Sequence, residues 1–120
     1  MRAGKYNLYL EQGVSLRKEF RCLVTGEPDV AVDFTGYSAR MQVRETYDST
    51  DALLDLTTEN GGIEALDATG VVAIVVTAEM TEGAAWRRGV YDIEVYGNGG
   101  VVVRILQGSV RLSPEVTRDY

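Results

Sequence analysis

Apolar and polar residues alternate along long stretches of this chain, and this period of two restricts the fold more than any other feature of the sequence. From Tyr37 to Arg44, each odd position is apolar and each even position is polar. Successive side chains of a strand point to opposite faces, so the pattern predicts a half-buried strand. Residues 14–24 alternate in the same way except at Lys18, and this exception predicts a bulge, a strand end or a sheet edge.

Further strands are expected where apolar segments lie between glycine-rich turns. One stretch, residues 77–86, is helix-like, with Thr77 as its N-cap and Glu79 in its first turn. Short strands with almost no helix predict an all-β fold, an antiparallel sandwich or barrel of about eight or nine strands. We expect one domain over residues 4–113 and a polar tail over residues 114–120. The further strands cover residues 6–10, 53–56, 71–76, 90–96, 101–107 and 109–113.

Charge and composition exclude several classes of function. The formal charge of −6 argues against bulk electrostatic binding to nucleic acid or anionic lipid. Histidine is absent, which removes the commonest general base and zinc ligand. The single cysteine, Cys22, lies among apolar residues and is expected to be a buried structural thiol. No signal peptide is visible, and the longest apolar run, Val71–Val76, is too short to span a membrane.

Asp92 and Glu94 are the one pair of carboxylates that suggests catalysis. They stand two residues apart on an expected strand, hence on one face and about 7 Å apart. This separation falls in the range of an inverting glycosidase, about 6.5–9.5 Å. However, every exposed strand face places residues i and i+2 at this distance, and no apolar pocket is evident nearby. We therefore expect a solvated face or a subunit contact, and no catalytic residue.

Metal and cofactor sites are not expected either. The acidic residues Asp48, Asp51 and Asp55 do not have the spacing of an EF-hand calcium loop, although a weak site shared with another loop stays an alternative. The segment 97–100, Gly-Asn-Gly-Gly, resembles a dinucleotide-binding loop only superficially. It lacks the third glycine of that motif and joins two strands instead of opening a helix.

Arginine and tyrosine side chains are the candidates for contacts with a partner. Arg40 and Arg44 share the outer face of one strand, and Arg104 interrupts an apolar one. Salt bridges or subunit contacts are favoured over an RNA or sugar-phosphate site because many acidic residues lie between the arginines. Tyr6, Tyr37 and Tyr91 are expected to face inward, and Tyr9, Tyr47, Tyr96 and Tyr120 to be exposed, on a surface that contacts sugar or protein. The predicted interface comprises Tyr6, Tyr9, Arg40, Arg44, Arg87, Arg88, Tyr96, Arg104, Val116, Arg118 and Tyr120.

Several short motifs, in this order, are similar to those of a known family. They are Gly36-Tyr37, the Asp-Ala-Thr-Gly of residues 67–70, Tyr91-Asp92, Gln107-Gly108 and the Ser-Pro-Glu-Val-Thr of residues 113–117. From Gly4 to Arg118 the chain resembles small phage and prophage virion proteins that are related to the N-terminal domain of siphophage upper baseplate proteins. These motifs are turn and strand signatures, so no functional residue is carried over with them.

The resemblance implies an immunoglobulin-like β-sandwich that serves as a non-enzymatic structural or adaptor protein of the virion. Its expected place is the tail, baseplate or fibre-attachment apparatus, in several copies that contact other virion proteins after synthesis in the cytoplasm of the bacterial host. The chain ends about where the sandwich ends, so we expect an accessory that docks on a tail, neck or capsid protein. Exposed strand edges suit such docking, and the first strand (6–10) and the last (110–112) are the expected edges. A carbohydrate-binding host-adhesion module, a head or collar decoration protein and a glycoside hydrolase using Asp92 and Glu94 are the alternatives.

Overall fold

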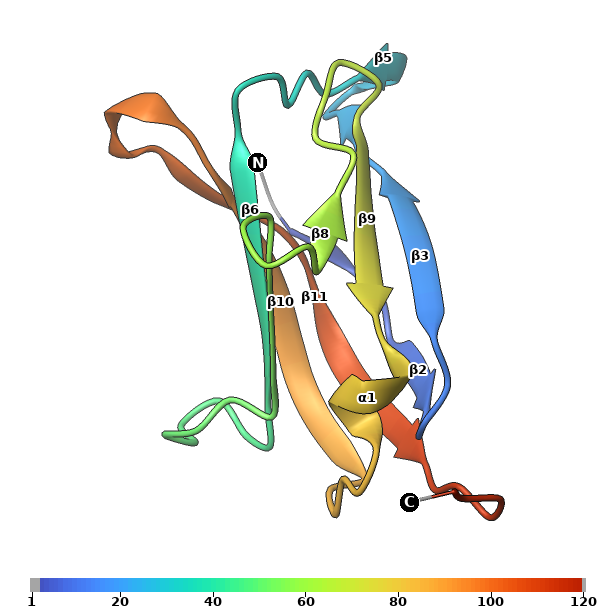
Figure 1. Ribbon diagram of the computed structural model, residues 1–120. Helices are drawn as coiled ribbons and strands as arrows, with labels where there is room; N and C mark the ends of the chain where they lie inside the picture. Colours follow the sequence, from blue (N-terminus) through green and yellow to red (C-terminus); the bar gives the residue numbers. More distant parts are fainter. Residues whose placement is uncertain (1–2, 120) are drawn as a thin grey trace.

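The computed structural model describes residues 3–119, apart from the side chains of Pro28 and Asn98. Two sheets pack face to face, so the all-β sandwich is confirmed (Figure 1). The larger sheet has the strand order β1-β11-β10-β6-β7, with β2 also paired to β11, and the smaller sheet has the order β3-β9-β8. A separate hairpin, β4-β5, lies at one end of the sandwich.

Eleven strands are present in this part of the chain, rather than the predicted eight or nine, because several are very short. The larger sheet consists of β1 (Gly4–Lys5), β2 (Leu8–Glu11), β6 (Ser38–Arg44), β7 (Leu54–Thr57), β10 (Arg88–Tyr96) and β11 (Val102–Ser113). The other strands are β3 (Leu16–Arg21), β4 (Leu23–Val24), β5 (Glu27–Ala31), β8 (Ile63–Glu64) and β9 (Val71–Val76). The helix α1 (Ala78–Thr81) forms a single turn with Thr77 at its N-cap position, as the sequence predicts, and η1 (Asn98–Gly100) joins β10 to β11.

Most strands pair antiparallel, as expected, but the N-terminal strands are an exception. Both β1 and β2 run parallel to β11, with Leu8 beside Val110 and Leu10 beside Leu112. The chain then crosses to the smaller sheet, where β3 pairs antiparallel with β9. The N-terminal strands therefore form one edge of the larger sheet, as predicted for residues 6–10.

The last strand does not lie at an edge, and this part of the prediction was wrong. Residues 101–107 and 109–113 form one continuous strand, β11, which lies between β10 and the N-terminal strands. Gly108 does not end the strand, since its backbone stays paired to Tyr91 of β10. A bulge at Ile105 adds one residue to β11, because Ile93 pairs with Leu106 whereas Glu94 pairs with Arg104.

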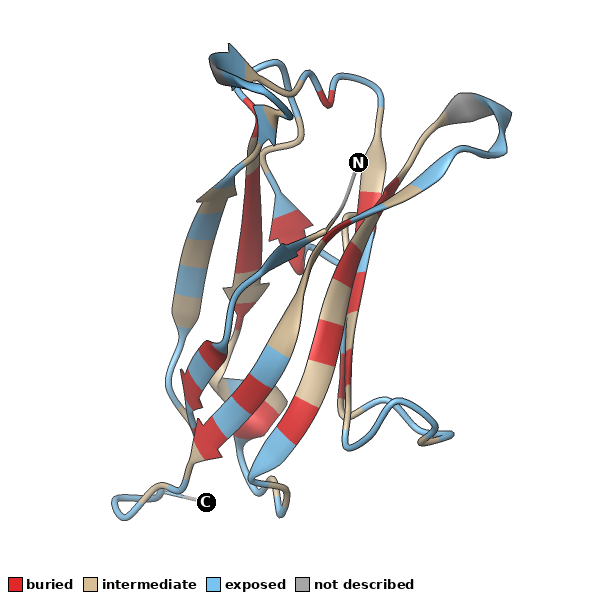
Figure 2. Ribbon diagram, turned by 180° about the vertical axis from the view of Figure 1, so that it is seen from behind, coloured by how far each residue is buried: buried red, intermediate tan, exposed pale blue. Residues whose placement is uncertain are grey.

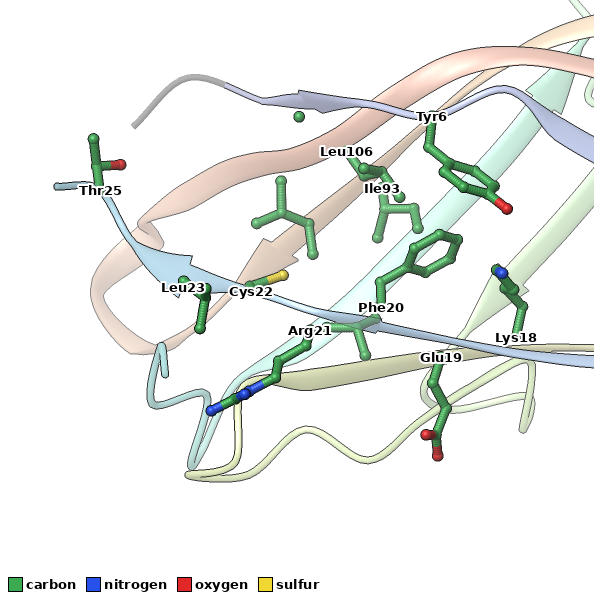
Figure 3. A pocket seen from close by; sticks show the side chains of 13 residues that line it. Tyr6, Lys18, Glu19, Phe20, Arg21, Cys22, Leu23, Thr25, Ile93 and Leu106 are labelled. Atoms are coloured by element: carbon green, nitrogen blue, oxygen red, sulfur yellow. The ribbon is translucent and has the colours of Figure 1, made fainter. Parts of the chain in front are cut away.

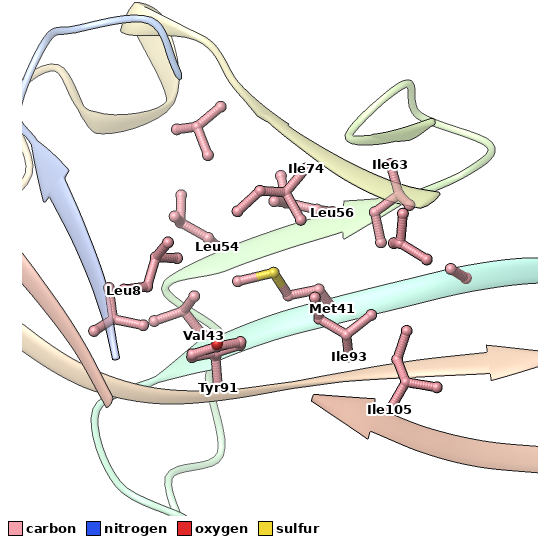
Figure 4. Close-up of a cluster of buried hydrophobic side chains, with 14 of the residues drawn as sticks. Leu8, Met41, Val43, Leu54, Leu56, Ile63, Ile74, Tyr91, Ile93 and Ile105 are labelled. Carbon is pink, nitrogen blue, oxygen red and sulfur yellow. The ribbon is translucent and has the colours of Figure 1, made fainter. Parts of the chain in front are cut away.

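The core lies between the two sheets. Alternate residues of β6 and β10 are buried, and the residues between them are half-buried or exposed, which gives the banded strands of Figure 2. Each sheet thus buries one face, and this burial supplies most of the driving force for folding. The largest fully buried side chains come from both sheets and include Met41, Leu56, Ile63, Ile74 and Ile93 (Figure 4).

Candidate interaction face

The outer face of the larger sheet is polar because the other face of the same strands forms the core. Strand register places Arg104 of β11, Glu94 of β10 and Arg40 of β6 in one row across three strands. The next row along the sheet contains Gln107, Asp92 and Gln42. Residues that are more than fifty positions apart in the sequence are therefore direct neighbours on this surface.

Two ion pairs form on this surface, one within the first row and one between the two rows. The Arg40 Nε lies 2.9 Å from Glu94 Oε1, and the Arg104 Nε lies 3.3 Å from Asp92 Oδ2. The Arg40 guanidinium also lies over the ring of Tyr96, 5.0 Å from its centroid, in cation–π geometry. We call this surface, with Arg40, Arg44, Arg104 and the two acids, the arginine face. Both carboxylates that suggested catalysis are thus engaged by an arginine.

A shallow groove of about 570 Å³ runs across the arginine face, lined by side chains of β1, β6, β10 and β11 and by Tyr47. Arg44 at its wall donates hydrogen bonds to the Ser49 carbonyl (2.9 Å) and to Gln42 Oε1 (2.7 Å), which hold the guanidinium in place. No ion pair to Arg44 or Lys5 is present within residues 3–119, so the groove has two cations without a carboxylate partner.

Cations are concentrated on this sheet although the whole chain is acidic. Half of the twelve Lys and Arg residues point outward from its strands, together with four carboxylates. The outward side chains of this sheet thus include more cations than carboxylates, although the net charge of the chain is −6. The cations are Lys5, Arg40, Arg44, Arg88, Arg104 and Arg111, and the acids are Glu11, Asp55, Asp92 and Glu94.

Most of the predicted interface residues fall on this one face. Arg40, Arg44, Tyr96 and Arg104 lie together, and Arg88 lies further along, opposite Arg111. Tyr9 is 63 % exposed. It belongs to the same sheet surface, because it pairs with Arg111 on the side of β11 opposite to β10. The sequence did not single out Lys5 and Gln42, which line the groove, because their neighbours depend on strand pairing.

The remaining predicted residues lie elsewhere. Arg87 donates to the carbonyls of Ala84 and Trp86 in the loop before β10. In the tail, Val116 is 91 % exposed and Arg118 donates to the Glu115 carbonyl, whereas Tyr120 lies outside the described residues.

The expectation that three tyrosines face inward holds for Tyr91, which is buried, and in part for Tyr37, which is half-buried. Tyr6 is 39 % exposed instead, because the gap between the sheets is open beside it. Cys22 is half-buried rather than fully buried, for it lines the same gap. Its partial burial raises the pKa of the thiol.

The pKa values of two carboxylates considered in the sequence analysis are shifted. Partial burial raises the pKa of Asp92, and Arg104 opposes this shift. Asp48, which suggested calcium, accepts a hydrogen bond from the Thr46 hydroxyl (2.7 Å), and this bond lowers its pKa.

Within the described range, no group of three or more His, Cys, Asp or Glu side chains is placed to hold a metal ion. No helix there is long and apolar enough to cross a membrane.

Neither the protein-family models nor the curated proteins compared with the chain match it.

Proposed function

We propose that the protein is a non-enzymatic structural or adaptor component of a tailed-phage virion that binds other virion proteins through the arginine face. The observation that carries the proposal is that Arg40, Arg44, Arg104 and Tyr96 point outward from one sheet, with Tyr47 of the loop after β6 at the groove. Arginine and tyrosine are enriched at protein–protein interfaces, where they combine large contact areas with several hydrogen-bond donors. The sequence resemblance to phage virion proteins supplies the setting.

The proposed location is the tail, baseplate or fibre-attachment apparatus, and a head or collar position is the alternative. In either place the protein is a multicopy component of the particle. A hydrolase role is not proposed, since Asp92 and Glu94 line a shallow groove where each is paired with an arginine. An inverting mechanism needs one of the two acids to be kept protonated in a shielded site.

The proposal is tested in purified virions of the phage or prophage that encodes the chain. We expect mass spectrometry to find the wild-type protein in the particles and the double variant Arg44→Glu/Tyr47→Ala to be reduced by about tenfold, which corresponds to about 1.4 kcal/mol of binding free energy. Arg87→Ala is the matched control because Arg87 lies outside the groove. Absence of the wild-type protein from the particles, or normal incorporation of the double variant, would reject the proposal.

Carbohydrate binding is the second candidate function, and one observation favours it. The groove combines an aromatic ring, Tyr47, which is 91 % exposed, with the amides of Asn7, Gln42 and Gln107. Aromatic rings and amides are groups that bind sugars. A glycan array with the wild-type protein, followed by Tyr47→Ala and Tyr96→Ala, separates the candidates: a sugar response lost in these variants supports a host-adhesion module, and no response removes it.

A further inference from the structure

A second surface lies away from the arginine face, along strand β3. This strand ends the order β3-β9-β8, so only one of its sides is paired. On the other side, alternate backbone N–H and C=O groups of Leu16–Arg21 have no strand partner in the described chain. Such an edge is a template for one more strand.

A groove of about 460 Å³, the gap beside Tyr6 and Cys22, lies along this edge between β3 and β1 and has both apolar and charged side chains in its lining (Figure 3). The rings of Tyr6 and Phe20 face each other across it, edge to face, with centroids 5.1 Å apart. Ile93 of the core and the half-buried Leu106 line it from the larger sheet. A strand added along β3 would place its inward side chains over this apolar surface.

Lys18 determines which strand fits. It lies on the inward side of β3, on the same side as Phe20, with its Nζ 5.2 Å from the Tyr6 ring centroid and 6.0 Å from that of Phe20. The nearby carboxylates are engaged elsewhere, because Arg17 pairs with both Glu19 and Glu64. Within residues 3–119 no carboxylate pairs with Lys18.

Lys18 also disfavours pairing between two copies of the chain. In a symmetric antiparallel pair of β3 strands, only the register centred on Lys18 places Leu16 opposite Phe20 and Arg17 opposite Glu19 of the second copy. That register also places the two Lys18 side chains directly opposite each other. Directly opposed like charges destabilise a strand pair, and an inward charge on an edge strand is a known protection against self-association.

We propose that the β3 edge and its groove bind an extended segment of another protein, with a carboxylate opposite Lys18 and apolar side chains over Tyr6 and Phe20. Main-chain hydrogen bonds to the edge supply affinity, and the apolar–acidic–apolar order of the inward residues supplies specificity. The inference depends on neither the arginine face nor a virion role.

The test uses two labelled peptides of about nine residues in which valine alternates with threonine. The central residue, on the valine face, is glutamate in one peptide and lysine in the other. We expect fluorescence anisotropy to show that the glutamate peptide binds the full-length protein at least about tenfold more tightly, which is the contribution of one partly desolvated ion pair. Lys18→Glu should reverse this preference. The matched control is Arg17→Glu, which reverses a charge on the opposite side of the same strand, outside the groove, and should leave the preference unaltered.

Hydrogen exchange gives a second measurement that does not depend on the label. Binding should slow the exchange of amides within residues 16–21, and circular dichroism should show that each variant is folded. No binding of the glutamate peptide at millimolar concentration, or a preference that Lys18→Glu leaves unaltered, overturns the proposal. Self-association of the wild-type protein through β3 would assign the edge to a second copy and would also overturn it. Since the assay uses only purified protein, its failure is distinct from absence of the chain in virions.

Discussion

Tyr91 and Gly108 together determine where the N-terminal segment meets the rest of the protein. The Tyr91 hydroxyl donates a 2.7 Å hydrogen bond to the carbonyl oxygen of Tyr6. Burial of the ring raises the pKa of Tyr91 to about 12, so the phenol keeps its proton at neutral pH. Gly108 lies against the same carbonyl group, which can approach so closely only because glycine has no Cβ.

We predict that Gly108→Ala destabilises the protein. Its new Cβ would overlap the Tyr6 carbonyl and lie 3.3 Å from the Tyr91 ring, so the edge segment has to move. Overpacking of this kind costs about 1–3 kcal/mol, measurable as a lower midpoint in urea denaturation. Gly4→Ala is the control, because its Cβ would meet nothing nearer than Leu106 Cδ1 at 3.4 Å. Equal midpoints for both variants would show that the close approach is unimportant.

The alternation of residues predicts burial at single positions, but not the partners of those positions. Ala39, Met41 and Val43 are buried as expected, because the period of two fixes their common face. The ion pair of Arg40 with Glu94 was not predictable, since it depends on β6 pairing with β10. The exposure of Tyr6 was not predictable either, because it depends on the gap between the two sheets.

At the scale of elements, long alternating strands were predictable and short ones were not. The expected strand over residues 14–24 divides into β3 and β4, because the Cys22 N–H bonds to the Gly70 carbonyl (2.7 Å) while its carbonyl accepts from Val32. Strand β5 was not predicted, because its sequence has no alternation of apolar and polar residues. The break in alternation at Lys18 left three alternatives open: a bulge, a strand end or a sheet edge. The structure shows that β3 is an edge strand.

A buried hydroxyl group connects the single turn of α1 to the turn that follows β2 of the larger sheet. Thr81 of α1 is fully buried, and its Oγ1 accepts a 2.7 Å hydrogen bond from the Gly13 N–H in the turn after β2. We predict that Thr81→Val, which keeps the shape and removes the acceptor, costs about 1–3 kcal/mol. It should also speed hydrogen exchange of the Gly13 amide. Thr81→Ser retains the hydroxyl and should preserve slow exchange of the Gly13 amide. If exchange is faster in both variants, the hydrogen bond is not what protects this amide, and its protection comes from burial alone.

At the scale of the whole molecule, composition predicted the average charge but not its distribution. The formal charge of −6 is correct as a sum, yet half of the cations point outward from one sheet. This concentration results from strands that are distant in sequence and adjacent in space. Composition therefore argued against bulk binding to anionic polymers, while the fold concentrates cations locally on one sheet.

The two ends of the chain contribute unequally to stability. The N-terminal strands pair with β11 across about a hundred residues of sequence, and Leu8 and Leu10 are only 4 % and 2 % exposed. In the tail, by contrast, Val116 is 91 % exposed. Loss of a buried leucine side chain costs about 2–5 kcal/mol, whereas a typical domain is stable by about 5–15 kcal/mol.

We therefore predict that deletion of residues 1–10 unfolds the protein, because it removes both leucines and exposes the edge of β11. Deletion of residues 116–120 should change the free energy of unfolding by less than about 1 kcal/mol, since residues 116–119 are exposed and the Arg118 hydrogen bond lies at the surface. Circular dichroism during thermal and urea denaturation measures both. If a cooperative transition is retained without residues 1–10, β11 needs no partner at this edge. The sandwich would then fold by itself, and the parallel pairing would only hold the N-terminal segment against it.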